Sequence, residues 1–448
     1  MKMKLQPAYH GETNTLDPWD ITLWGREVLS LLREKNLAVN FVNTDYEPTI
    51  EAYGRVVNAR VRGNLKAKRK NHNSDVKVQK LKGSTTPVEL DQFWHTSFVV
   101  DDWGSTRTFG GLVDEFLEPA AFAISGGINA SILGQGPKFI DRRFGELGGV
   151  TATNVQSYFA GFNGVMNEGQ DWGGAPLFIG NSTRTAGISA DIFAKVNESG
   201  SSATLRKAQL GEIYNMNPYK TADVPGNPNR ALTNTTTTTA AAIPGATTIA
   251  LTSVTGVDAG DRIAVAGKPY RVASVASLVV TLTSPLLEPV ANGATVKAFG
   301  QTTVDGAKSA GHAEEIYLDA AVVKGDVIDI VDGASAGFTT YTIIDIDGTE
   351  VWLDRPLAQD IADGAVVSLW PGGNYNFGFS KNAILMVARG LPVVPPGLGS
   401  RSTMVNYGGL PLRITLSYEP RGQQTLVTLD MLGGLKPVML NEGGILLA

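Results

Sequence analysis

The chain has 448 residues, a formal net charge of −5, 43% hydrophobic and only 18% charged residues, with 51 glycines and no cysteine. This length predicts roughly two to four domains, each able to bury its own core. The composition excludes disulfides and thiolate metal sites, and without a long apolar run or a basic and apolar leader we expect neither a membrane span nor a secretory signal.

The N-terminal part predicts an extended start, one helix and a pair of strands. Asp17 is a candidate N-cap with Pro18 at the first helical position, and apolar residues at helical spacing predict a helix that ends near Lys35. Strand-like runs follow at 55–63 and 88–100. Together they form a two-stranded excursion that is too thin to be stable without packing on a neighbour.

A basic block lies between these two runs. Residues 55–82 contain ten Lys or Arg and one acid, Asp75. The side chains that we expect to contact neighbouring subunits are Arg60, Arg62, Lys66, Lys68, Arg69, Lys70, Lys77, Lys80 and Lys82. The block favours attraction to a polyanion or to acidic patches of another subunit, and the alternative is a solvated loop. It has no aromatic residue to stack on bases, which argues against sequence-specific reading of nucleic acid.

The next segment alternates helices and strands. Apolar residues keep helical spacing over 109–133, where Pro119 should kink or restart the helix. A third helix is predicted to begin near Asn154, followed by a buried strand at 175–180 and a helical segment at 190–196.

Residues 226–372 contain two copies of one β-rich pattern. Asp261 and Asp326 lie 65 residues apart, and Gly293 and Gly364 lie 71 apart. This self-similarity predicts two tandem units, each a small sandwich or barrel, with a hairpin turn at 347–348. The stretch holds 16 Asp or Glu against 8 Lys or Arg, so it carries the acidic excess of the chain.

Catalytic and metal-binding interpretations find little support. No metal-ligand spacing or nucleophile pattern surrounds the four histidines, which are His10, His72, His95 and His312. Asp345, Asp347 and Glu350 suggest calcium, but their spacing is too short for the twelve-residue loop, and a hairpin turn explains the same residues. We therefore expect no enzymatic activity, no cofactor and no metal.

Six segments outside the tandem units carry a resemblance to a known family. They are NTDYEP (43–48), GRVVNARVRG (54–63), DEFLEPAAFAIS (114–125), LRKAQLGEIYNMNPYKTADVP (205–225), FGFSKNAILMVARGLPVVPPG (377–397) and LPLRITLSYEPRGQQTLVTLDMLGGLKPV (410–438). In this order they resemble the major capsid, or coat, proteins of tailed double-stranded DNA bacteriophages, in the branch whose coat protein carries an inserted domain. The likeness covers everything outside 226–372.

The resemblance implies an α+β Hong Kong-type capsid fold. Its parts would be an N-terminal arm and helix (1–53), an extended loop hairpin (54–103), a peripheral domain with a spine helix (104–152), an axial domain in two parts (153–225 and 373–409), the inserted tandem β units (226–372) and C-terminal peripheral-domain strands (410–448).

The resemblance also implies a structural function. The chain would self-assemble through pentamers and hexamers into the icosahedral head shell of a virion, enclosing double-stranded DNA, with assembly in the cytoplasm of the bacterial host. Further partners to expect are a scaffolding protein, a portal and a cement protein, with non-specific DNA contact and no membrane. An acidic insertion suits the outer surface, away from DNA phosphate. The alternatives are an encapsulin-like compartment shell and, in a different class, a β-rich surface adhesin or carbohydrate-binding protein.

Overall fold

The computed structural model describes residues 27–28, 38–44, 56–61, 67–70, 72, 75–76, 78, 84–101, 113–149, 154–167, 177–181, 216–221, 223–227, 234–311, 315–318, 322–332, 337–395, 400–407 and 410–448. Among these residues the structure is mixed and strands dominate, with 48% strand and 15% helix. The chain divides into a smaller body (1–35, 94–125 and 389–431) and a larger body (36–93, 126–388 and 432–448). The predicted helix at 17–35, apart from helical Glu27 and Val28, and the segment at 190–196 lie outside the described residues.

The smaller body is built on long antiparallel strands. Strand β22 (Leu410–Glu419) pairs on one side with β21 (Ser400–Tyr407) and on the other with β23 (Gln424–Pro437), which also pairs with β3 (Gln92–Asp101). Apolar residues alternate with polar ones along β22, so its odd and even positions separate into a half-exposed and a buried face. The alternation therefore fixes which face of the sheet is buried.

The longest helix begins with a change of helical type. Residues Val113–Leu117 form a π-helical turn (η3), and α3 (Glu118–Leu133) continues from it. Pro119 lies in the first turn of α3, a position that suits proline because it has no N–H to donate. The predicted restart of the helix at Pro119 is confirmed, and the four residues before Val113 lie outside the described part of the chain.

The helical stretch Glu115–Phe139 is unusually long and apolar. By length and composition it could span a membrane, with a mean hydropathy of 1.3, although the sequence contains no uninterrupted apolar run of that length. In the structure 56% of this apolar window is buried inside the protein. A largely buried core helix meets the same criterion, and we interpret α3 as one.

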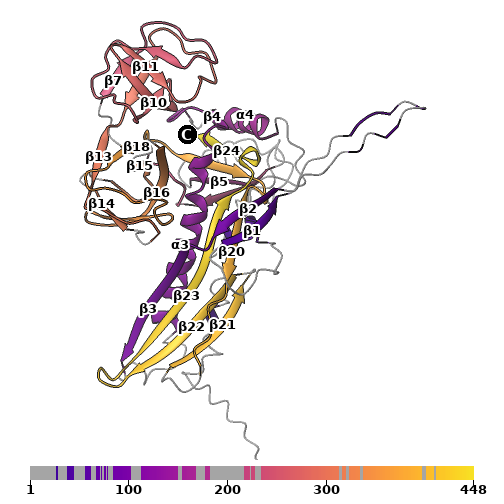
Figure 1. Ribbon diagram of the computed structural model, residues 1–448, viewed down its shortest axis with the longest axis vertical. Coiled ribbons are helices and arrows are strands. Elements are labelled where there is room, and N and C mark those ends of the chain that lie inside the picture. Colours follow the sequence, from indigo (N-terminus) through magenta and orange to yellow (C-terminus); the bar gives the residue numbers. More distant parts are fainter. Residues whose placement is uncertain are drawn as a thin grey trace, which may run out of the picture. The chain divides into compact units, whose positions relative to one another are not determined.

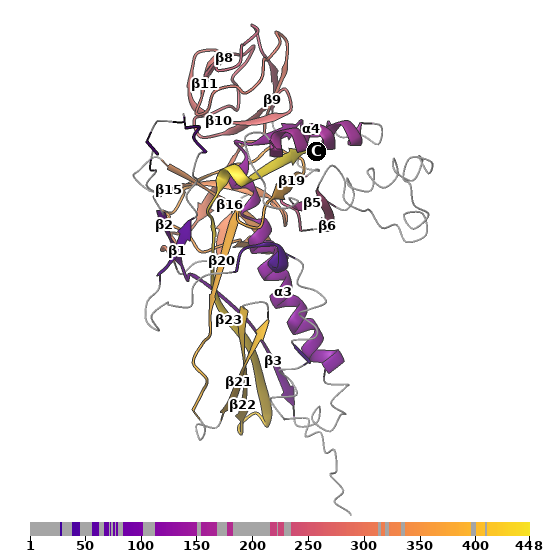
Figure 2. The ribbon, with the colours of Figure 1, turned by 90° about the vertical axis from the view of Figure 1, so that its right-hand side faces the viewer.

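The larger body contains a mixed sheet in the order β4-β24-β19-β5-β6. Its strands are β4 (Arg143–Gly145), β5 (Leu177–Asn181), β6 (Asn217–Thr221), β19 (Tyr375–Phe379) and β24 (Gly443–Leu447). Helix α4 (Val155–Asn167) lies against β24 (Figure 2). Its Phe159, Phe162 and Met166 pack with Phe178 and Leu446. The helix predicted near Asn154 and the buried strand predicted at 175–180 are confirmed by α4 and β5.

Two β units form a large part of the larger body. The strands of the first β unit are β7 (Asn234–Thr237), β8 (Thr248–Ala250), β9 (Arg262–Val265), β10 (Lys268–Ala276), β11 (Val279–Leu282) and β12 (Thr295–Ala298). Those of the second β unit are β13 (Gln301–Asp305), β14 (Glu315–Leu318), β15 (Val327–Asp332), β16 (Gly337–Asp347), β17 (Glu350–Leu353) and β18 (Val366–Leu369). Each unit has its own apolar core, and Figure 1 shows each as a separate compact set of strands.

The two β units share one strand order. The first is arranged β7-β12-β9-β10-β11-β8, and the second closes as β13-β18-β15-β16-β17-β14, the same circuit six strands later. A backbone bridge between Thr238 and Leu251 joins the two outer strands of the first unit. Buried tyrosines 71 residues apart, Tyr270 and Tyr341, accept hydrogen bonds from the backbone amides of Leu287 and Ala358. The repeated pattern therefore folds twice into the same architecture.

The predicted hairpin in the second unit is confirmed, with its turn one residue later than predicted. Asp347 pairs with Glu350, which leaves Gly348 and Thr349 as a two-residue loop between β16 and β17. Gly348 has φ 63°, a conformation that suits a glycine at the first loop position.

One strand prediction is wrong. The run at 88–100 is two strands, β2 (Ser84–Glu89) and β3, separated at Leu90 and Asp91. Alternation continues through the break, but β2 pairs with β1 (Val56–Val61) and β3 pairs with β23. The change of partner interrupts the strand, and alternation alone does not reveal it.

The remaining elements are short. They are η1 (Ala38–Phe41), η4 (Gly136–Phe139), η6 (Leu440–Glu442) and β20 (Ile384–Arg389).

Candidate functional site: the basic hairpin and the paired β units

The basic hairpin consists of β1, β2 and the residues between them, and its base is firmly packed. The two strands are antiparallel in a register that runs from Val56 opposite Glu89 to Val61 opposite Ser84. At the base Val57, Val88 and Leu90 form a buried cluster with Leu385 and Val387 of β20. This packing supplies the support that a two-stranded ribbon needs.

The tip of the hairpin is exposed. Lys68, Arg69 and Lys70 have exposed side chains and irregular backbone, and Val76 and Val78 are 71% and 86% exposed. Arg60 lies in β1, and the other predicted contact residues lie outside the described part of the chain, namely Arg62, Lys66, Lys77, Lys80 and Lys82. A hairpin with a packed base and an exposed tip of charged and apolar residues is suited to contact with another molecule.

A buried carboxylate joins the two β units. Oδ2 of Asp329, in β15, lies 3.0 Å from Nε of Arg262 and 2.8 Å from Nη2 of Arg271 in the first unit. The backbone N–H of Arg262 donates to Oγ of Ser368 at 3.1 Å, and its guanidinium lies 3.9 Å from the ring centroid of Trp370. One buried charge cluster therefore holds the two β units together.

The electrostatics of this cluster favour an ionised Asp329. Burial opposes the charged form of a carboxyl group that is fully removed from solvent. Arg262 and Arg271, together with a hydrogen bond from Thr340, outweigh that cost and hold the pKa of Asp329 below its ordinary value. The carboxylate is thus charged at neutral pH and forms an ion pair with both guanidinium groups.

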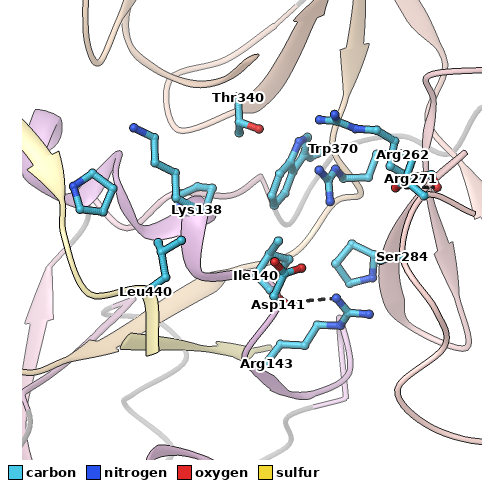
Figure 3. Close-up of a pocket in the computed structure, with 14 residues that line it drawn as sticks. Lys138, Ile140, Asp141, Arg143, Arg262, Arg271, Ser284, Thr340, Trp370 and Leu440 are labelled. Carbon is cyan, nitrogen blue, oxygen red and sulfur yellow. Dashed lines mark hydrogen bonds between the residues drawn. The ribbon is translucent and has the colours of Figure 1, made fainter. Parts of the chain in front are cut away.

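A cavity of about 430 Å³ opens beside this cluster. Figure 3 shows Arg262, Arg271 and Trp370 on one side of it and Lys138 and Leu440 on the other. Arg143 donates from Nη1 to the carbonyl oxygen of Ile140 at 3.2 Å, and its guanidinium lies 4.3 Å from the ring centroid of Tyr270. Because these cations make structural contacts, we interpret the cavity as a seam between the β units and the neighbouring sheet.

A second buried carboxylate holds the second β unit against the end of α3. Oδ2 of Asp354 accepts hydrogen bonds from Nε2 of Gln135 at 3.1 Å and from Nη1 of Arg355 at 2.9 Å. Burial raises the pKa of Asp354, although Arg355 and the backbone amide of Thr342 oppose the shift. Nζ of Lys138 donates to Oε1 of Gln135 at 2.7 Å, so one polar chain links β unit and helix end.

Lys138 makes this contact sensitive to pH. Burial, followed by the charge of Arg355, lowers the pKa of Lys138 from 10.5 to about 7. Because the unfolded chain keeps this proton up to its ordinary pKa, the free energy of unfolding is expected to rise as pH is raised from about 7 towards 10. Lys138→Met should remove that rise in urea unfolding, whereas the exposed control Lys70→Met should keep it. Equal pH dependence in Lys138→Met and the unmodified protein would refute the assignment.

Sequence reasoning missed these anchoring residues, although the repeat contains a signal. In the other copy of each strand, Arg262 corresponds to Val327 and Arg271 to Thr342. Where one β unit has a charged residue and the other has an apolar or neutral one, the charged residue indicates a contact outside its own unit. No group of three metal-ligating side chains occurs among the residues that the structure describes.

Similarity to known proteins is found among solved structures. No protein-family model matches the chain, and no curated protein does. Solved structures that are similar include one of Mycobacterium phage Che8, with TM-score 0.42 and 9% identity over 92% of this chain and 90% of that chain. The capsid of cyanophage P-SCSP1u gives 0.44 and 8% over 92% and 86%, and that of Staphylococcus phage Andhra 0.38 and 8% over 90% and 82%. These similar structures come from phages, two of them capsids by title, and their TM-scores lie below 0.5.

Proposed function

We propose that the chain is a major capsid protein that self-assembles into the head shell of a tailed phage. The observation that carries the proposal is the basic hairpin, whose base is packed in the larger body while Lys68, Arg69, Lys70, Val76 and Val78 are exposed at its tip. Such an element gains contact area only by meeting another chain. The ordered resemblance of six segments to coat proteins supports the same function. Some of the similar structures are named as phage capsids, which agrees with this function, but the proposal does not depend on them.

The finer parts of the proposal follow the resemblance. The fold would be of the Hong Kong type, with 226–372 as an insertion into the axial domain that decorates or stabilises the outer surface. Subunits would form pentamers and hexamers in a virion that is assembled in the host cytoplasm around double-stranded DNA. The function would be structural and would involve no catalysis. A scaffolding protein, a portal and a cement protein would be further partners.

Electron microscopy of the purified protein tests the proposal. Closed shells that carry double-stranded DNA when isolated from infected cells would support the capsid function. Shells filled with protein cargo would favour the encapsulin-like alternative. A chain that stays monomeric under all assembly conditions would refute both and favour an adhesin.

Reversing the charge of the hairpin tip should impair assembly without unfolding the subunit. With Lys66, Lys68, Arg69 and Lys70 all changed to Glu, we expect the yield of particles to fall by about tenfold, since charged contacts between subunits become repulsive. Circular dichroism and thermal unfolding should stay unchanged. Arg401→Glu with Arg421→Glu, two exposed cations outside the hairpin, is the matched control. Normal particle yield from the hairpin variant would remove this block from the mechanism.

A further inference from the structure

The outer face of the second β unit carries two rows of cross-strand neighbours. In the first row Asp345 of β16 lies opposite Trp352 of β17, which lies opposite Glu315 of β14. In the next row Asp347, Glu350 and Tyr317 follow one another in the same way. Residues directly opposite on paired strands point to the same side of a sheet, and residues two apart share that side. The intervening Val351 and Ile316 are fully buried, so both rows face outward.

These six residues, called here the acidic-aromatic face, are arranged to attract cations. Four carboxylates flank two aromatic rings on three strands, and the side chains of Asp345, Asp347 and Glu315 are exposed. A hydrogen bond with Glu350 raises the pKa of Glu315, and the nearby charge of Lys308 opposes this shift without cancelling it, so two carboxyl groups lie close together on this face. Nζ of Lys308 already lies 4.6 Å from the ring centroid of Tyr317, so one of these rings accepts a cation.

The first β unit shows that the fold does not require this face. Its strands have the same pairing and the same register shift in the longest strand, yet the corresponding residues are neither acidic nor aromatic. In the order of the two rows they are Ser274, Thr281 and Thr248, then Ala276, Val279 and Ala250. Since both copies close the same strand circuit, the four carboxylates and two rings are a property of the surface of the second unit and not of its architecture.

We propose that the acidic-aromatic face is the docking surface for the basic segment Lys68, Arg69 and Lys70 of a second copy of this chain. The inference rests on the proposed function and names the partner of the hairpin tip. Three consecutive exposed cations complement four carboxylates, and guanidinium and ammonium groups bind aromatic rings. An extended three-residue segment spans about 7–10 Å, which matches strands spaced about 4.8 Å apart. The exposed tip and the exposed face thereby cover each other.

A disulfide experiment tests the contact directly. The chain has no cysteine, so Arg69→Cys combined with Glu350→Cys gives one defined pair of thiols per subunit. After oxidation of assembled particles, covalent multimers on a non-reducing gel should exceed those of the control pair Arg69→Cys and Val279→Cys by about tenfold, because the control places its thiol at the matching position of the first unit. Multimers no more abundant than in the control, or bonds formed only within single chains, would overturn the proposal.

Charge exchange between the two surfaces is the second test of the docking proposal. Glu315→Lys, Asp347→Lys and Glu350→Lys together should lower particle yield by about tenfold, and adding Lys68→Glu, Arg69→Glu and Lys70→Glu should restore most of it. Absence of rescue would contradict the pairing. If the unmodified chain forms no closed particle, the proposed function itself fails. If it forms particles but shows neither the specific disulfide nor rescue, only the docking assignment fails.

Discussion

Replacing Asp329 by alanine is expected to lower the free energy of unfolding by about 3–5 kcal/mol, the range found when one partner of a buried ion pair is removed. The variant would leave the largely buried guanidinium groups of Arg262 and Arg271, at present 3.0 and 2.8 Å from the carboxylate, without their anion. Because the carboxylate belongs to one β unit and both arginines to the other, the loss should separate the two units before either core unfolds.

Thermal unfolding and proteolysis at the junction of the β units would measure this effect. Asp347→Ala is the matched control, because it removes a carboxylate from the same unit at an exposed position and should change stability by less than about 0.5 kcal/mol. A loss no larger in Asp329→Ala than in the control would show that the buried cluster does not hold the units together.

The pH dependence of the junction has the same sign as that of Lys138 but falls in the acid range. Because its two arginines hold the pKa of Asp329 below the ordinary value of 3.8, the carboxylate stabilises the folded state fully above that value. The contribution is lost as pH falls through the lower folded pKa. Acid unfolding of the protein should therefore be steeper than that of Asp329→Ala, and identical acid transitions would contradict the assignment.

The sequence predicts local architecture well where one pattern controls it. Spacings such as that between Gly293 and Gly364 predict two tandem β units, and both glycines have positive φ, 78° and 74°, as repeated turns require. The helix restart at Pro119 follows from a single missing donor. Each of these features depends on local chain conformation or on a pattern that repeats along the sequence.

The contacts between units could not be predicted in the same way. Asp329 is one of 16 acids in 226–372, and its alternation with Ile328 and Ile330 places it on the outer face of its unit, where an exposed carboxylate would be expected. It is buried because the first unit covers it, a fact that requires the mutual placement of strands far apart in the sequence. The sequence indicates only part of the acidic-aromatic face, namely the calcium-like pattern of Asp345, Asp347 and Glu350. Glu315 and Tyr317 lie far from these residues in the sequence and join them only through strand pairing.

Gly434→Ala is expected to destabilise the protein by about 3 kcal/mol, at the upper end of the range for overpacking a filled site. A Cβ at this position of β23 would lie 1.9 Å from the carbonyl oxygen of Glu89, the last residue of β2. A backbone oxygen has no rotamer by which to withdraw, so the two strands must separate. The base of the basic hairpin would then be pushed from the cluster of Val88 and Leu90 that holds it.

The effect of Gly434→Ala should reach assembly as well as stability, because the hairpin tip can meet a neighbouring subunit only from a fixed base. Urea unfolding would give the stability change, and particle counts by electron microscopy the loss of shells. Gly164→Ala is the matched control, since this exposed helical glycine has no neighbouring atom within 4 Å of the added Cβ, and alanine there should stabilise α4 by up to about 1 kcal/mol. Wild-type stability in Gly434→Ala would mean that β23 and the end of β2 are not packed this closely in solution.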